Sequence, residues 1–174
     1  DLMEGVAAEA ASLAGHLQLG KLTCLYDDNS VTLSAGPDIT FPAARRERFA
    51  AYGWHVQTVD DGNDVGAIEQ ALQRARDETG KPSLILVRTH IGYGSPEQDS
   101  YKAHGSPLGE KDVAATKQNL RWPEQPPFLV PDDALAHFRN ALDRGKQAQA
   151  DWEARFAAYA KAFPEPAAEL QRSL

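Results

Sequence analysis

A short polar segment directly after an apolar run is the first feature of this sequence that could do chemistry. The run Leu22 to Tyr26 is followed by Asp27, Asp28 and Asn29, and the sequence turns apolar again at Val31. A buried parallel strand that ends in this way delivers oxygen atoms to the carboxyl edge of an open α/β sheet, where such sheets bind ligands. The Asn29 side chain and the Val31 carbonyl could then fill two adjacent positions on a hard cation such as Mg²⁺. The alternative is an ordinary strand-to-loop turn.

A glycine-rich loop holds the second group of candidates. It begins Thr89-His90-Ile91-Gly92-Tyr93-Gly94-Ser95-Pro96 and reaches His104-Gly105-Ser106-Pro107-Leu108-Gly109. Glycine lets the backbone approach a ligand closely, and a histidine can bind a phosphate or act near a reacting group. Loops of about twenty residues in a compact domain are usually functional or disordered. The alternative for His104 is an exposed loop histidine without a role.

Two acids, Glu4 and Glu9, lie in an alanine-rich segment that is predicted to be helical. They are five positions apart and so do not share one strict helix face. If this helix is buried at a subunit contact, the acids need charged or protonated partners. The alternative is a helix with a solvated acidic side.

The composition narrows the class of protein. The formal net charge of the 174 residues is -7, and the short basic runs are interrupted by acids, which disfavours a nucleic-acid partner. No apolar stretch approaches the roughly 20 residues that a membrane span requires, so no membrane partner is expected. Cys24 is the single cysteine, which fits a reducing, cytoplasmic location. Serine or cysteine nucleophile patterns, zinc spacings, a Walker-type lysine and the Rossmann fingerprint are absent from the sequence.

Helical and strand patterns alternate along the first part of the chain. Helices are predicted over 4–19 (with Gly20 as its stop), 43–52 and 65–79, strands over 22–26, 54–59 and 83–89, an irregular connection with a Gly36-Pro37 turn over 30–42, and a turn and N-cap over 60–64. This order predicts an α/β fold, a parallel sheet with helices on both faces. The rest of the chain predicts a helical, proline-interrupted extension, and we expect domains at 1–110 and 111–174.

Several motifs in this order resemble the transketolase family. They include Leu2-Met3-Glu4-Gly5, Ser12-Leu13-Ala14-Gly15-His16-Leu17, Tyr26-Asp27-Asp28-Asn29, Ala51-Tyr52-Gly53-Trp54-His55-Val56, Ile91-Gly92-Tyr93-Gly94-Ser95 and His104-Gly105-Ser106-Pro107-Leu108-Gly109. The resemblance covers essentially the whole chain. It implies the later part of the N-terminal domain, a partial thiamine-diphosphate-binding fold, followed by a segment that leads to the next domain.

The resemblance also implies cofactors and ligands. Thiamine diphosphate is expected with Mg²⁺ or Ca²⁺, and Asn29 (side chain) and Val31 (carbonyl) are implied as metal ligands. The family's Gly-Asp-Gly motif, with the principal acidic ligand, is expected immediately before Asp1. Ile91 is implied to pack on the thiamine, and His104 to lie at the cofactor and substrate channel.

The implied function is transfer of a two-carbon ketol unit between sugar phosphates. Glu4 and Glu9 match an acidic cluster at the homodimer interface of the family. The remainder of the transketolase chain and a second subunit are therefore expected partners, and this segment is not expected to be active alone. A dihydroxyacetone synthase-like relative and a non-catalytic transketolase-like subunit remain alternatives. A generic flavodoxin-like domain fits the predicted fold but not the ordered motifs.

Overall fold

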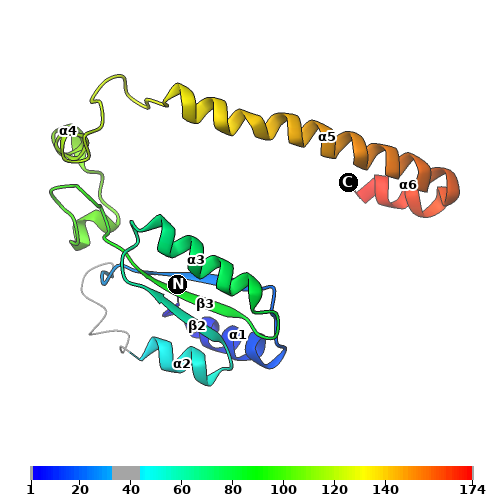
Figure 1. The fold of residues 1–174 in the computed structure, drawn as a ribbon, viewed down its shortest axis with the longest axis horizontal. Coiled ribbons are helices and arrows are strands. Elements are labelled where there is room, and N and C mark those ends of the chain that lie inside the picture. The colour runs from blue at the N-terminus through cyan, green and yellow to red at the C-terminus, as the bar shows by residue number, and fades with distance from the viewer. Residues whose placement is uncertain (1, 33–43, 174) are drawn as a thin grey trace. The chain divides into compact units, whose positions relative to one another are not determined.

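Among the residues that the structure describes, three parallel strands form the sheet on which the first part of the chain is built (Figure 1). The computed structural model describes residues 2–32 and 44–173. In it, β1 (Thr23–Asp28) and β2 (His55–Val59) both pair in parallel with β3 (Ser83–Arg88), so the order is β1-β3-β2. Every residue of β3 before Arg88 is buried. A central strand that is apolar and buried on both sides is typical of a parallel sheet between two layers of helices.

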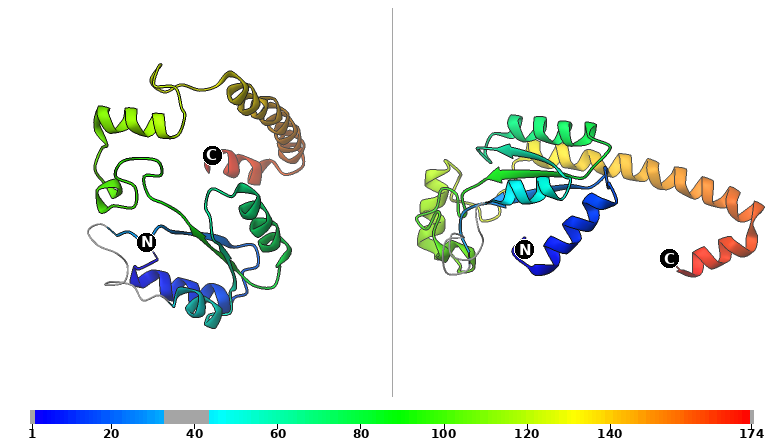
Figure 2. Two further views of the ribbon diagram at one scale, coloured as in Figure 1. Left: turned by 60° about the vertical axis from the view of Figure 1, so that its left-hand side comes forward. Right: turned by 90° about the horizontal axis from the view of Figure 1, so that it is seen from below.

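Different helices cover the two faces of this sheet. Side chains alternate between the faces of a strand, so Leu84 and Leu86 of β3 pack with α1 (Gly5–His16) and α2 (Arg45–Ala51). Ile85 and Val87 pack on the other face, against Ala71 and Ala75 of α3 (Val65–Asp77). Figure 2 shows α3 on one side of the sheet and α1 and α2 on the other. The predicted α/β fold with helices on both faces is confirmed.

An aromatic cluster joins α1 and α2 to the sheet. The Trp54 indole N–H donates a hydrogen bond of 2.8 Å to the Ala11 carbonyl of α1. The Phe49 ring of α2 meets the Trp54 ring edge to face, with centroids 5.2 Å apart. Edge-to-face contacts of this kind add to the free energy gained from burial. The hydrogen bond and the ring contact together set the position of α1 and α2 relative to the sheet.

The predicted end of the first helix is wrong. The helix ends at His16, and Gln18 takes the left-handed conformation with φ 51°, instead of a glycine at position 20. Gly20 is required for a different reason. A Cβ atom at this position would lie 1.9 Å from the carbonyl oxygen of Thr79, so the glycine permits close contact with the chain after α3.

The strand before the polar segment is longer than predicted. Asp27 and Asp28 continue β1 and pair with Val87 and Arg88, so they are strand residues and not a turn. The remaining elements lie within two residues of their predicted bounds, and Asp64 caps α3 by accepting a hydrogen bond from the Ala67 N–H. The predicted Gly36-Pro37 turn and residue 43 of the predicted helix lie outside the described residues.

One face of β1 and one side of α1 are open. Leu25 of β1 is 53% exposed although its partner in register, Ile85, is fully buried. In α1 only Ala11 and Ala14 are buried, while Val6 and Leu13 remain exposed. Within the described residues, the sheet is therefore covered on both faces at β3 but on one face at β1.

The chain continues as a loop and helices. A short 3-10 helix, η1 (Tyr101–His104), and α4 (Gly109–Asn119) belong with the sheet to a first compact unit, Asp1–Glu124. The second unit, Gln125–Leu174, contains α5 (Asp132–Ala162) and α6 (Pro164–Ser173). The predicted domain boundary between 110 and 111 stays a prediction.

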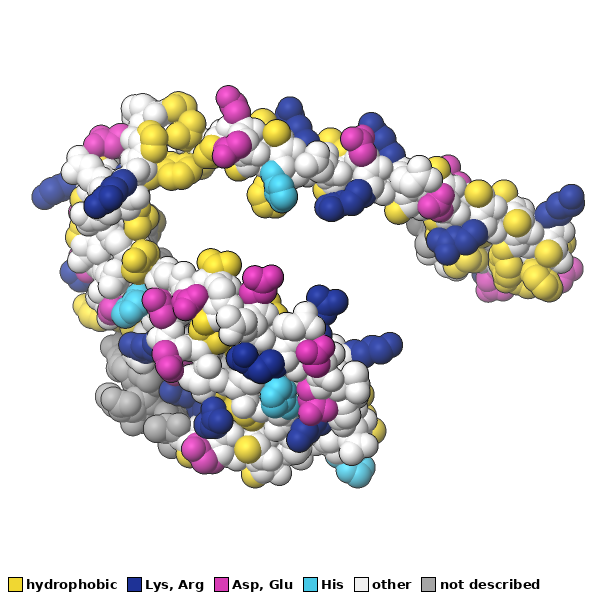
Figure 3. Space-filling model, viewed as in Figure 1, with side chains coloured by type: hydrophobic (Ala, Val, Ile, Leu, Met, Phe, Trp, Pro, Cys, Tyr) yellow, Lys and Arg dark blue, Asp and Glu magenta, His cyan; other side chains and the backbone are white. Residues whose placement is uncertain are grey.

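The second unit exposes much apolar surface. Trp152 and Phe156 stack in parallel on α5 with centroids 5.2 Å apart, and Ala167 of α6 is buried. Figure 3 shows apolar side chains gathered where α5 meets α6, among them Tyr159, Phe163 and Leu170. None of the helices described is long and apolar enough to cross a membrane.

We expect Gly15→Ala to destabilise the first unit. The new Cβ would lie 1.8 Å from the backbone oxygen of Tyr52, so α1 and the turn after α2 must move apart. Such overpacking costs about 1–3 kcal/mol. Thermal unfolding of the complete polypeptide measures this loss. Gly66→Ala is the matched control because its Cβ meets only the flexible Asp64 side chain, at 3.4 Å; equal unfolding midpoints for the two variants would contradict the packing of α1.

The Cys24 thiol should react slowly in the folded protein. Burial raises the pKa of this thiol, and the thiolate is the reactive form. At pH 8, iodoacetamide should therefore label Cys24 more slowly in the native protein than in urea, as followed by mass spectrometry of its peptide. The raised pKa also makes the free energy of unfolding depend on pH, because the folded state holds the Cys24 proton more tightly than the unfolded state does. The contribution of Cys24 to this free energy is full below the unfolded pKa of about 8.5 and is lost as the pH rises through the folded pKa. Equal labelling rates would contradict the burial.

Candidate active site

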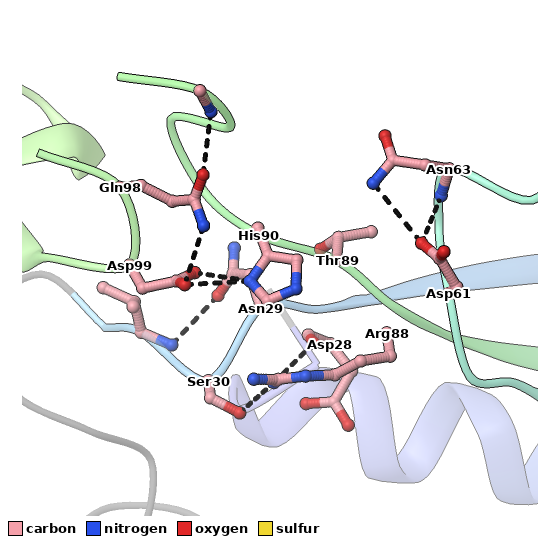
Figure 4. Close-up of polar contacts among 12 residues, drawn as sticks. Asp28, Asn29, Ser30, Asp61, Asn63, Arg88, Thr89, His90, Gln98 and Asp99 are labelled. Atoms are coloured by element: carbon pink, nitrogen blue, oxygen red, sulfur yellow. Dashed lines mark hydrogen bonds and ion pairs between the residues drawn. The ribbon is translucent and has the colours of Figure 1, made fainter. Parts of the chain in front are cut away.

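The carboxyl ends of the strands bring polar residues together at one edge of the sheet (Figure 4). Asp28 of β1 and Arg88 of β3 are partners in register. The backbone ladder continues beyond them, since the Thr89 N–H donates to the Asp28 carbonyl at 3.3 Å. The turn after β2 joins the same edge through a 2.6 Å hydrogen bond from the Gly62 N–H to the Arg88 carbonyl. Segments from all three strands therefore meet where an α/β sheet binds its ligands.

Asn29 is held in one orientation at this edge. Its side-chain oxygen accepts a hydrogen bond of 3.0 Å from the Val31 N–H, and its amide nitrogen donates to Asp27 at 3.2 Å. Asp27 in turn accepts a hydrogen bond from the Thr89 hydroxyl. An asparagine that bonds the backbone two residues ahead forms a local turn. Asn29 and Val31, which were predicted as a pair, are thus held together by a direct hydrogen bond.

Arg88 ties the next part of the turn to β3. Its guanidinium donates to the Asp28 carbonyl at 3.1 Å and also to the Ser30 hydroxyl. Ser30 has φ 57°, a left-handed conformation that is uncommon for residues other than glycine. The Arg88 side chain therefore holds the backbone in place where the chain turns away from β1, at Asp28 and Ser30.

A second arginine pairs with the acid that precedes Asn29. Arg45, at the start of α2, donates to both oxygens of Asp28 at 3.2 and 3.3 Å, and their side chains are only 14% and 22% exposed. The guanidinium also lies 5.3 Å from the centre of the Tyr26 ring. Burial raises the pKa of Tyr26, and the positive charge of Arg45 opposes that rise. This cluster could not be predicted from the sequence, because a long connection separates Arg45 from Tyr26 and Asp28.

The donors at this edge fit part of a ligand set for a hard cation. Among residues 2–32 and 44–173, no group of three or more His, Cys, Asp or Glu side chains could hold a metal. Asp27 and Asp28 are engaged by Thr89 and Arg45. An amide oxygen has two lone pairs, so Asn29 can accept from Val31 and still face a cation. Neutral oxygens of this kind suit Mg²⁺ that also binds phosphate oxygens.

The glycines of the loop after β3 are needed for its conformation. Gly92 and Gly94 have φ values of 63° and 78°. A Cβ atom at Gly92 would lie 3.0 Å from the Ala103 Cβ, and one at Gly94 would lie 2.7 Å from Leu120. The loop is therefore a folded structure in which distant residues pack against the glycine backbone.

The base of this loop is closed by a histidine and an aspartate that the sequence reasoning missed. His90 donates from Nδ1 to the Asp99 carboxylate at 2.8 Å, and Gln98 donates to the same carboxylate at 3.3 Å (Figure 4). The hydrogen bond from His90 lowers the pKa of Asp99, desolvation opposes this effect in part, and the hydrogen bond from Gln98 adds a smaller lowering effect. The pair was missed because neither residue belongs to a spacing with a known chemical meaning.

The other predicted site residues lie in different places. Ile91 directly follows His90, next to the end of β3, and is partly buried, whereas His104 is exposed at the end of η1. No hydrogen bond within the described part of the chain joins His104 to Asn29 or Val31. Glu4 is the N-cap residue of α1, Glu9 lies within that helix, and both are exposed.

Known proteins resemble this chain in sequence and in fold. A transketolase of Nostoc sp. is 47% identical over 174 residues, which cover 99% of this chain and 26% of the relative. A transketolase of Geobacillus stearothermophilus is 45% identical over 176 residues. A Pichia stipitis transketolase in complex with sedoheptulose-7-phosphate superimposes with a TM-score of 0.84 at 38% identity, over 98% of this chain and 25% of that one.

The family of the chain follows from a match over its full length. This chain spans about a quarter of the length of the relatives it matches. The family model described as "Transketolase, thiamine diphosphate binding domain" matches residues 1–174. The chain therefore belongs to the transketolase N-terminal domain family, whose model describes a thiamine diphosphate binding domain.

Proposed function

We propose that this chain is the diphosphate-binding part of a transketolase that moves a two-carbon ketol unit from a ketose phosphate to an aldose phosphate. The observation that carries the proposal is the match of the thiamine diphosphate binding domain over residues 1–174. The oxygen donors at the carboxyl edge of the sheet support it, since these are the groups that a metal–diphosphate ligand requires. The relatives named as transketolases support the activity.

Each predicted site residue has a role in this proposal. Thiamine diphosphate, when bound, supplies the carbon nucleophile that accepts the ketol unit. Asn29 and Val31 hold the Mg²⁺ or Ca²⁺ ion on the diphosphate through a side-chain oxygen and a carbonyl. Ile91 packs on the thiamine, and His104 donates hydrogen bonds to the phosphate or substrate.

The proposed protein is a homodimer with Glu4 and Glu9 at its interface. The support is the uncovered side of α1, where Val6 and Leu13 are 71% and 57% exposed. Glu9 and Leu13 line an open groove of about 530 Å³ between this helix and Tyr52. Large apolar side chains that remain exposed in one chain are typical of a protein–protein contact. The proposed location is cytoplasmic, on the evidence of the single cysteine.

The experiment that tests the function is performed on the complete polypeptide that contains this segment. Thiamine diphosphate is titrated in the presence and absence of Mg²⁺ while tryptophan fluorescence is followed, and turnover is measured with a ketose phosphate and an aldose phosphate. We expect metal-dependent binding and ketol transfer. Binding without turnover would favour a non-catalytic subunit, transfer to formaldehyde would favour a dihydroxyacetone synthase, and failure to bind the cofactor would overturn the proposal.

Asn29→Ala should weaken metal-dependent cofactor binding. The variant removes a proposed metal ligand and the acceptor of the Val31 N–H. We expect the Kd for thiamine diphosphate at fixed Mg²⁺ to rise at least about tenfold, a loss typical even of residues that only orient a metal ligand. Asn140→Ala is the control, because Asn140 is exposed on α5 in the other unit. An unchanged Kd for Asn29→Ala would remove Asn29 from the site.

His104→Ala should lower ketol transfer with little effect on folding. His104 is exposed on η1, so its removal leaves no cavity. If it donates hydrogen bonds at the reacting end of the site, kcat/KM should fall about 10²-fold or more. Circular dichroism and the unfolding midpoint serve as controls for the fold. A large drop in the midpoint together with the loss of activity would show that His104 is a structural residue instead.

A further inference from the structure

The loop that follows β3 is closed at its base by two interactions of the same residue. The Asp99 N–H donates to the Ile91 carbonyl at 3.0 Å. The Asp99 carboxylate accepts from His90 at 2.8 and 3.1 Å. Asp99 therefore binds both of the first two loop residues after Thr89, one through its backbone and one through its side chain.

The rest of the loop is held by two further side chains, of which Gln98 also donates to the Asp99 carboxylate at 3.3 Å. The Gly94 N–H donates to the Gln98 side-chain oxygen at 2.8 Å, and Asn119 at the end of α4 donates to the Gly94 carbonyl at 2.9 Å. The tip of the loop is thus attached to α4. Its two ends meet at the base: the Ile91 carbonyl is bound there by Asp99, and Ala103, which precedes His104, lies against Gly92.

Asp99 also has a backbone conformation that needs support. Its φ is 59°, in the left-handed region that only glycine, asparagine and aspartate visit with ease. The ion pair with His90 holds the side chain of a residue in this uncommon conformation. A loop without the pair would have fewer constraints on the direction in which the chain runs on to η1.

We propose that His90 and Asp99 are positioning residues, which hold Ile91 and His104 in the arrangement that binds thiamine diphosphate. This inference rests on the proposed function. The side chains of His90 and Asp99 are 38% and 41% exposed. Exposed ion pairs contribute little to global stability, so the role of this pair is to select one loop conformation and not to stabilise the fold.

The test uses the complete polypeptide and three changes at the pair. His90→Leu removes the donor, Asp99→Asn removes the charge but tolerates the left-handed backbone, and His90→Asn returns an N–H close to the position of Nδ1. Lys102→Ala is the matched control, because it removes an ion pair with Glu97 in the same loop, at 3.5 Å, that does not close the base. The measurements are the Kd for thiamine diphosphate with Mg²⁺, amide hydrogen exchange over residues 90–105 without cofactor, and the unfolding midpoint.

We expect His90→Leu and Asp99→Asn each to raise the Kd about fivefold, which corresponds to about 1 kcal/mol, and to speed amide exchange in the loop. The double variant His90→Leu/Asp99→Asn should be no worse than His90→Leu alone, because without the His90 donor the charge of Asp99 has no ion pair with His90 left to lose. His90→Asn should recover part of the affinity, and Lys102→Ala should match the wild type. The unfolding midpoint should not change.

Two results would overturn the inference while leaving the proposed function intact. The first is an unchanged Kd and unchanged loop exchange in both single variants of a wild type that binds the cofactor. The second is a fall in the unfolding midpoint that accounts for the whole loss of affinity, since it would make the pair a structural one. If the wild type itself does not bind thiamine diphosphate, the proposed function fails instead, and loop exchange alone still reports whether the pair orders the loop.

Discussion

The burial of β3 on both faces is the constraint on which the rest of the first unit depends. Because Ser83 to Val87 are all buried, β3 must lie between α3 and the pair of helices α1 and α2, and both other strands must pair with it. Parallel pairing then aligns the strand ends, so that Asp28 meets Arg88 and the turn after β2 reaches the Arg88 carbonyl. The polar edge exists because parallel strands buried between two helical layers end at the same side of the sheet, where polar residues follow them.

At this edge both carboxylates are engaged by other residues of the chain before any ligand is present. Asp28 is bound by Arg45, while Asp27 accepts from Thr89 and Asn29. Two uncompensated carboxylates would repel a diphosphate, because Coulomb energies are large where water is partly excluded. With both carboxylates engaged, the neutral oxygens of Asn29 and Val31 are the donors left for the proposed ligand. In the proposed site, the metal ion would supply the positive charge that a diphosphate requires.

Much of the fold could be predicted from the sequence, because apolar periodicity reports burial directly. The run from Ser83 to Val87 and the spacing of Ala71 and Ala75 sufficed for a strand and a helix. Contacts between distant residues could not be predicted. Gly20 has the features of a helix stop, but it is required by its contact with Thr79, and the partners Arg45–Asp28 and His90–Asp99 follow from the tertiary structure alone. Asn29 and Val31 could be placed because both directly follow one strand, β1, whereas the surroundings of His104 depend on a loop path that periodicity does not encode.

The outer side of β1 has a consequence for how such a domain can be divided. Among the described residues β1 pairs on one side only, and its Leu25 is 53% exposed. An unpaired strand with an apolar face is a template for addition of another chain and hence for aggregation. A recombinant piece that begins just before this strand would thus be prone to self-association through backbone hydrogen bonds. Expression of such pieces calls for a charged substitution on β1.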